Sequence, residues 1–141
     1  MGTSNISILL VEDDEVDVMN IKRAFQKNNL SNPLETAENG LVALAMLRGD
    51  GVKKLDPRPK IILLDLNMPK MNGIEFLKIL RSDNELKTIS VVILTTSNDE
   101  KDIVDAYDLN VAGYILKPVE FSKFVEAMRT LNLYWSLMEH P

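Results

Sequence analysis

The chain contains no cysteine, and its single histidine, His140, is the second-to-last residue. Disulfide bonds, thiolate nucleophiles and cysteine-ligated zinc sites are therefore excluded, and the absence of cysteine is compatible with a cytosolic protein. A lone histidine at the end of the chain gives no support to a histidine-dependent catalytic triad or a histidine-rich metal site. Chemistry that needs either side chain is not expected.

The sequence also lacks the marks of a membrane or nucleic-acid-binding protein. No apolar run approaches the roughly 20 residues that span a bilayer, and no basic run of the secretory type opens the chain. Ile6 occupies the Ser/Thr position of the myristoylation pattern that would begin at Gly2. The 21 Asp and Glu residues outnumber the 16 Lys and Arg residues and give a net charge of -5, which disfavours direct nucleic-acid binding. We therefore expect a cytoplasmic protein that contacts neither membranes nor nucleic acid.

Strand-like and helix-like segments alternate along the 141 residues without a dividing linker, so we expect one domain, residues 1–141, with no output domain. Five β/α pairs predict an α/β fold, a doubly wound parallel sheet with helices on both faces. The segment Gly49–Lys60, with two prolines and two glycines, predicts one long loop. The expected strands are Ser7–Val11, Leu34–Thr36, Ile61–Asp65, Ser90–Thr95 and Tyr114–Leu116. The expected helices are Glu15–Asn28, Gly40–Arg48, Gly73–Arg81, Asp99–Leu109 and the long Phe121–Met138.

Acidic residues follow two of the expected strands. Glu12 and Asp13 come directly after the first strand, and Asp65 ends the third. Ligands bind at the carboxyl ends of the strands in open α/β sheets, and three carboxylates would meet there if the first and third strands were neighbours. Like charges so close are costly unless a cation compensates them. Because the available ligands are oxygens, we expect Mg²⁺.

Thr95 and Lys117 also stand at strand ends, where a hydroxyl and an amine could hold phosphoryl oxygens. Each has a simpler interpretation, as a β-branched residue at a sheet edge or as a plain ion pair. Asp13 could equally be the N-cap of the first helix. The acids that follow it fit a solvated helix N-terminus stabilised by the helix dipole: Asp14, Glu15 and Asp17.

The order Glu12-Asp13, Asp65, Thr95, Lys117-Pro118 resembles the receiver domain of two-component response regulators. Four blocks carry the resemblance over nearly the whole chain: "LLVEDD", "LLDLNMPKMNG", "VVILTTS" and "GYILKP". The resemblance implies a flavodoxin-like (βα)5 fold with strand order 2-1-3-4-5 and an extended last helix. It also implies a CheY-like signalling domain rather than an enzyme, one that assists its own phosphorylation and dephosphorylation.

The resemblance further assigns a role to each site residue. Asp65 would be the phospho-acceptor, and Thr95 and Lys117 would hold the phosphoryl oxygens. Tyr114 would be the aromatic switch residue coupled to Thr95, and Pro118 would follow a cis peptide bond. The Mg²⁺ ligands would be Asp13, Asp65, the backbone carbonyl of Asn67 and, through water, Glu12.

A finer resemblance concerns the partner. The approach Pro57-Arg58-Pro59, the "LTTS" block and a Trp-containing tail ending in proline look like stand-alone regulators partnered with bacterial phytochromes. The implied phosphodonor is a histidine kinase, with a phytochrome-type kinase as one candidate. Output would run through a downstream protein or a phosphotransfer protein.

The expected last helix carries apolar residues at 4-3-4-3 spacing, which is compatible with helix–helix packing. We expect a homodimer through this helix, and the alternative is that the helix folds back on its own domain. The seam consists of Phe124, Met128, Leu131, Trp135 and Met138.

Two other functions remain open from the sequence. A pseudo-receiver would keep the fold as a binding module without phosphorylation. A Mg²⁺-dependent phosphatase of the haloacid dehalogenase type would need a second aspartate where this chain has Asn67. P-loop NTPases and dinucleotide-binding proteins are excluded because neither glycine motif is present.

Overall fold

The computed structural model describes residues 7–27, 33–66, 68, 70–95, 108–116 and 126. Its strands form one parallel sheet in the order β2-β1-β3-β4-β5, as expected. The strands are β1 (Ile8–Val11), β2 (Leu34–Ala37), β3 (Ile61–Asp65), β4 (Ser90–Thr95) and β5 (Gly113–Leu116). The helices that the described residues form are α1 (Glu15–Lys27), α2 (Gly40–Arg48) and α3 (Gly73–Ser82).

These bounds differ from the sequence expectations by single residues. Ser7 precedes β1 instead of opening it, whereas Ala37, Ser82 and Gly113 extend β2, α3 and β5. The ends of a strand depend on hydrogen bonds to a neighbouring strand that is far away in the sequence. The local residue pattern therefore predicts the first and last residue of an element only approximately. The expected helices Asp99–Leu109 and Phe121–Met138 lie almost entirely outside the described residues. Among the described helices, none is long and apolar enough to cross a membrane.

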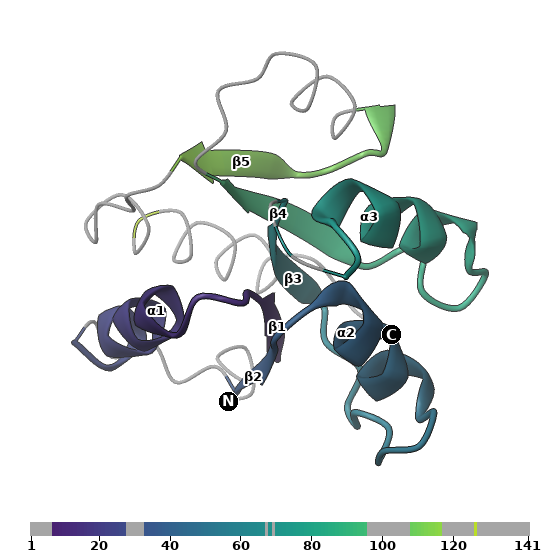
Figure 1. Cartoon of the computed structure of the whole chain (residues 1–141), viewed down its shortest axis with the longest axis horizontal. Coiled ribbons are helices and arrows are strands. Elements are labelled where there is room, and N and C mark those ends of the chain that lie inside the picture. Colours follow the sequence, from purple (N-terminus) through teal and green to yellow (C-terminus); the bar gives the residue numbers. More distant parts are fainter. Residues whose placement is uncertain are drawn as a thin grey trace, which may run out of the picture.

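The sheet separates two layers of helix. Figure 1 shows α1 on one face of the sheet and α2 with α3 on the other. Successive strand residues point to opposite faces, and each face has its own apolar cluster. On the α1 side the strands contribute Ile8, Leu10, Ile61, Leu63, Val92 and Leu94. On the side of α2 and α3 they contribute Leu9, Val11, Ile62, Leu64, Val91 and Ile93.

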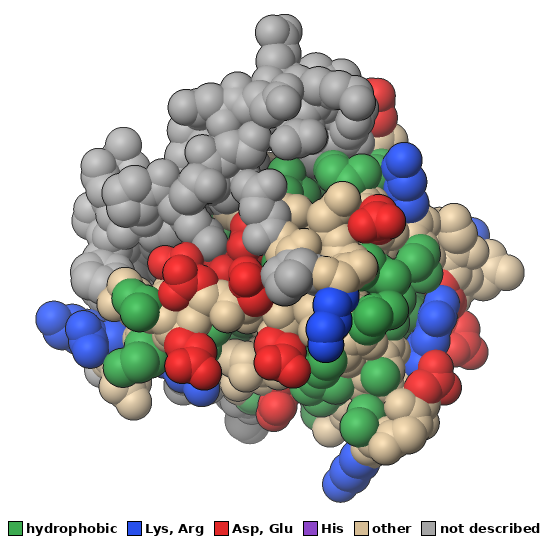
Figure 2. Space-filling model, viewed as in Figure 1, with side chains coloured by type: hydrophobic (Ala, Val, Ile, Leu, Met, Phe, Trp, Pro, Cys, Tyr) green, Lys and Arg blue, Asp and Glu red, His purple; other side chains and the backbone are tan. Residues whose placement is uncertain are grey.

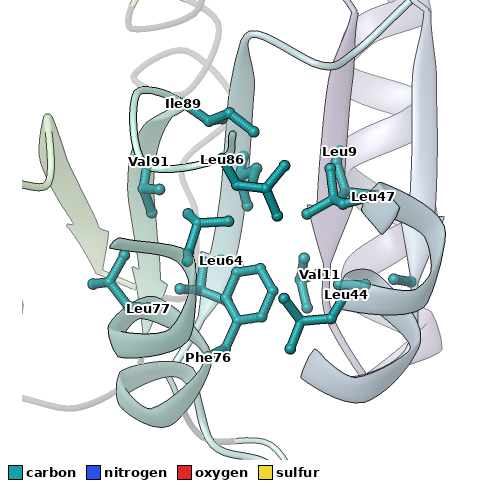
Figure 3. Packing of buried hydrophobic residues seen from close by; sticks show 14 of the residues in the cluster. Leu9, Val11, Leu44, Leu47, Leu64, Phe76, Leu77, Leu86, Ile89 and Val91 are labelled. Atoms are coloured by element: carbon teal, nitrogen blue, oxygen red, sulfur yellow. The ribbon is translucent and has the colours of Figure 1, made fainter. Parts of the chain in front are cut away.

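The helices meet the sheet through residues at helical spacing. Helix α1 buries Ile21, Ala24 and Phe25, the i, i+3, i+4 pattern of one helix face. Figure 3 shows Phe76 of α3 lying among Leu64 and the side chains of α2. Each fully buried side chain of this size contributes about 1.5–3 kcal/mol to folding. Strand β3 is buried at all five positions and pairs with β1 and β4, and Asp65 stands at its end.

Candidate functional site

The pairing of β1 with β3 places Glu12 beside Asp65. Val11 lies opposite Leu64 in the parallel register, and the Glu12 N–H continues the ladder by donating to the Ala37 carbonyl at 3.0 Å. The alternation of side chains then puts Glu12 and Asp65 on the same face of the sheet, the face that α1 covers. Both side chains are nearly buried, at 2% and 4% exposed.

Asp13 completes an acidic cluster at this edge. One carboxylate oxygen from each of Glu12, Asp13 and Asp65 lies within 4.8 Å of the others. Asp13 is exposed, so the cluster opens to solvent on one side. Figure 2 shows acidic side chains gathered on the face of the molecule between α1 and α2.

The donor set fits a small hard cation. Oxygens bound to octahedral Mg²⁺ at about 2.1 Å lie about 3.0 Å apart when adjacent and about 4.2 Å apart when opposite. The 4.8 Å that bounds the oxygens of this cluster is close to the larger of these two spacings, so the three carboxylates lie near enough to hold one such ion directly or through its waters. Mg²⁺ takes one or two carboxylates directly and keeps several waters, which matches a cluster of two buried acids and one exposed acid.

The structure assigns the N-cap of α1 to Asp14 and not to Asp13. The Asp14 carboxylate accepts from the backbone N–H groups of Val16 at 2.8 Å and Asp17 at 3.3 Å. The Asp14 N–H in turn donates to the Glu12 carboxylate at 3.2 Å. The capping interpretation of Asp13 was therefore wrong, because α1 begins at Glu15 as expected and its cap is the residue directly before it, Asp14. Asp13 instead belongs to the acidic cluster.

Gly73 is a site residue that sequence reasoning passed over. Its N–H donates to the Leu66 carbonyl at 2.9 Å. A Cβ at this position would lie 2.6 Å from the Leu66 Cα and 2.7 Å from the Asp65 carbonyl oxygen. Only glycine lets the start of α3 approach the end of β3 this closely. The block "LLDLNMPKMNG" contains Gly73, but nothing local to the sequence shows which backbone it would touch.

A capping box fixes the start of the same helix. The Asn72 side chain accepts from the Glu75 N–H at 2.9 Å, and the Glu75 carboxylate accepts from the Asn72 N–H at 3.0 Å. This reciprocal pair satisfies two backbone donors that the first helical turn leaves unpaired. The β3–α3 connection is thus held at both ends, which restrains the backbone next to Asp65.

The strand ends that carry the other expected residues lie at the same edge of the sheet. Asp65 pairs with Leu94 in β4, and Thr95 pairs with Leu116 in β5. Lys117 follows Leu116 in sequence, but Lys117, Asn67 and Pro118 lie outside the described residues, as do the side-chain positions of Thr95 and Tyr114. The structure therefore brings together the three carboxylates of Glu12, Asp13 and Asp65. It also places the end of β4, at Thr95, at the same edge of the sheet as these carboxylates.

Arg81, which sequence reasoning also missed, anchors the turns that lead into β4 and β5. Its guanidinium donates to the carbonyls of Ile89 at 2.8 Å, Leu109 at 2.7 Å and Asn110 at 3.1 Å. Partial burial lowers the pKa of Arg81, although a guanidinium stays charged at all physiological pH values. One half-buried side chain at the end of α3 thus helps to fix the turns before two strands of the sheet.

A family comparison identifies the fold. The model of the response regulator receiver domain matches residues 8–129. The chain belongs to this family. The response regulator Rcp1 of Synechocystis sp. is 35% identical over 128 residues, which cover 91% of this chain and 87% of that protein.

Solved receiver structures agree with the architecture. The phosphorylated cyanobacterial phytochrome response regulator RcpA superposes with a TM-score of 0.81 at 37% identity, covering 96% of this chain and 97% of that one. The Mn²⁺-bound form of Rcp1 has a TM-score of 0.79 at 34% identity, with coverage of 96% and 98%. The receiver domain of Rcp1 therefore binds a divalent cation. The acidic cluster of this chain is consistent with such a site.

Proposed function

We propose that this chain is a response regulator receiver domain whose Asp65 accepts a phosphoryl group from a histidine kinase. The acidic cluster carries this proposal. Asp65 is nearly buried at the end of the buried strand β3 and has two more carboxylates within 4.8 Å. A carboxylate held in this way can act as the nucleophile in phosphoryl transfer.

The transfer exchanges one bond to phosphorus for another. A carboxylate oxygen of Asp65 bonds to the phosphorus of the kinase phosphohistidine as the P–N bond breaks, and the bonding electron pair leaves with the imidazole. The product is an acyl phosphate on Asp65. Catalysis of such a step consists mostly of positioning and charge neutralisation. The anchored β3–α3 connection supplies the positioning, because the Asn72–Glu75 capping box and the Gly73 contact restrain its backbone.

The neutralising groups are the metal site and two strand-end residues. Asp13, Asp65 and the backbone carbonyl of Asn67 would hold Mg²⁺, with Glu12 acting through water. The bound cation would offset the negative charge that gathers around Asp65. Thr95 and Lys117 would hold the phosphoryl oxygens. The alignment of Thr95 with Leu116, the residue before Lys117, supports this assignment.

Phosphorylation would act as a switch through a shift between two conformations. The new charge on Asp65 recruits the Thr95 hydroxyl, and Tyr114 responds to the space that Thr95 vacates. The surface that includes β5 and the last helix changes as a result. A downstream protein or a phosphotransfer protein reads this surface, and a homodimer forms through the last helix.

The relatives suggest the kind of kinase. RcpA is described as a phytochrome response regulator, and this chain is similar to it over nearly its whole length. A phytochrome-type histidine kinase is therefore the first phosphodonor to test. Phosphotransfer from each histidine kinase of the host, followed over short times, identifies the cognate kinase as the one that labels this chain fastest.

Incubation with Mg²⁺ and acetyl phosphate, followed by intact mass measurement, tests the assignment of Asp65. We expect one added phosphoryl group on the wild type and none on Asp65→Asn. The matched control is Asp56→Asn, which changes an exposed aspartate in the loop between α2 and β3 and should be phosphorylated like the wild type. EDTA should abolish the adduct in the wild type and in Asp56→Asn.

Two outcomes would favour another function. A wild type that gains no phosphoryl group from acetyl phosphate or from any host kinase would be a pseudo-receiver that acts as a binding module. Sustained turnover of many phosphomonoesters, lost in Asp65→Asn, would identify a Mg²⁺-dependent phosphatase.

A further inference from the structure

A second concave site lies at the opposite end of the sheet from the acidic cluster. A pocket of about 880 Å³ opens between the connection from α2 to β3 and the connection from α3 to β4. Figure 1 shows both connections on the side of the sheet that α2 and α3 cover. Lys60 directly precedes β3 and Ile89 directly precedes β4, and both line the pocket. The five residues of β3 separate this end from Asp65 by roughly 16 Å.

The lining combines positive charge with apolar surface. Its charged members are four cations and one acid: Lys53, Lys54, Arg58, Lys60 and Asp56. Its apolar members are Leu55, Pro57, Pro59 and Ile89. The lining therefore carries a net positive charge, whereas the total charge of the chain is -5. Among the described residues, Lys53, Lys54 and Arg58 form no ion pair with a carboxylate.

The walls of the pocket are held in place by hydrogen bonds along the loop. The Leu55 N–H donates to the Met46 carbonyl at 3.0 Å, and the Lys60 N–H donates to the Ser7 carbonyl at 3.1 Å. The Arg58 guanidinium donates to the Glu85 carbonyl at 2.6 Å and so ties the two connections together. The long loop therefore presents a preformed concavity, which lowers the entropic cost of binding a ligand.

We propose that this pocket binds a small organic phosphate, a molecule with phosphate groups next to an apolar or aromatic body, as in a nucleotide. Lysine and arginine are the usual binding groups for phosphate. The exposed Pro57 and the half-buried Leu55 supply an apolar surface for the body. The volume lies within the range of small-ligand pockets, roughly 300–1,000 Å³. An acidic peptide needs an extended groove rather than a single concavity, so a small ligand fits the shape better.

Titration of the ¹⁵N-labelled full chain with ATP in EDTA tests the proposal. EDTA removes divalent cations, so that Mg²⁺ bound to ATP cannot draw the nucleotide to the acidic cluster. We expect saturable shifts of amide signals from residues 53–60 and 88–89. Adenosine has the aromatic body of ATP without the phosphates, and tripolyphosphate has the phosphate charge without the body. Each should bind at least about tenfold more weakly than ATP.

Matched variants separate the pocket from general charge attraction. Lys53→Gln with Lys54→Gln should weaken ATP binding by about tenfold or more. Lys22→Gln with Lys27→Gln removes the same charge from exposed positions on α1 and should leave ATP binding unchanged. Asp65→Asn should bind ATP like the wild type. The proposal of a phosphate-binding pocket is therefore tested independently of the proposed phosphorylation of Asp65.

Three results would overturn the proposal. The first is no saturable shift of the loop signals at millimolar ATP. The second is tripolyphosphate binding as tight as ATP binding, because the pocket would then select charge alone. The third is displacement of ATP by an Asp- and Glu-rich peptide at a lower concentration than ATP itself needs, which would make the pocket a protein-docking site.

Discussion

Replacing Gly73 with alanine measures how closely α3 must approach the phospho-acceptor strand. The new Cβ would lie 2.6 Å from the Leu66 Cα, against 3.4 Å or more for ordinary van der Waals contact. Both opposing groups are backbone atoms, so no side-chain rotation relieves the overlap. One of the two backbones must therefore move by about 0.8 Å in a closely packed region.

The size of the effect follows from two opposing contributions. Forcing an extra methyl group into a packed region costs about 1–3 kcal/mol. Alanine is favoured over glycine in a helix by up to about 1 kcal/mol, and this gain offsets part of the cost. We therefore expect Gly73→Ala to lower the free energy of unfolding by about 1–2 kcal/mol. Urea denaturation followed by circular dichroism measures this difference.

Two other glycines provide controls for the same substitution. At Gly113 a Cβ meets nothing within 4 Å, so Gly113→Ala should stay within about 0.5 kcal/mol of the wild type. At Gly40 the Cβ would lie 3.0 Å from the sulfur of Met71, a flexible side chain that can turn away. The expected order of destabilisation is therefore Gly73, then Gly40, then Gly113. A Gly73→Ala protein that unfolds at the same urea concentration as Gly113→Ala would refute the packing argument.

The same variant also links packing to the proposed function. A backbone shift at Leu66 moves the adjacent Asp65, and a misplacement approaching 1 Å can slow a positioned reaction by about 10–100-fold. Phosphorylation of Gly73→Ala by acetyl phosphate should therefore slow within this range under conditions where the protein is folded. Unchanged phosphorylation kinetics would show that the strain is absorbed on the α3 side instead.

Three further predictions concern caps, charge and metal. Asn72→Ala should lower the free energy of unfolding by about 1 kcal/mol in urea denaturation, because the capping box of α3 is lost; equal stability would contradict a role for the box. The Glu85 N–H, together with the Arg48 guanidinium at 3.1 Å, lowers the pKa of Asp83 below its usual 3.8. The ionised carboxylate therefore stabilises the fold above pH 3.8, and this contribution is lost as the pH falls through the lowered pKa. In thermal unfolding between pH 5 and about pH 2, Asp83→Asn should therefore lose less stability than the wild type. Asp13→Asn should weaken Mg²⁺ binding by about tenfold without unfolding the protein, because it removes an exposed ligand charge; calorimetry that shows unchanged affinity would remove Asp13 from the site.

Much of the fold could be predicted because its signals are local. The apolar runs of β1, β3 and β4 mark strands that are covered on both faces, and the spacing of Phe76, Leu77 and Leu80 marks the buried face of α3. The candidate site could be predicted in part because Glu12, Asp13 and Asp65 stand where strands end. The N-cap of α1 was predicted less well, because four consecutive acids compete for one capping position and only the backbone geometry selects Asp14.

The sequence by itself determined which segments become strands and helices, since hydrophobic periodicity acts over a few neighbouring residues. It also determined that acids and a hydroxyl follow the strands. Only the tertiary structure decided that β1 lies against β3 and so brings Glu12 and Asp13 to Asp65. It alone decided that Gly73 touches the backbone of Leu66, and that Arg58 joins two loops into one basic pocket. These contacts join residues brought together by strand order and layer packing, which depend on the burial of the whole chain and not on any single segment.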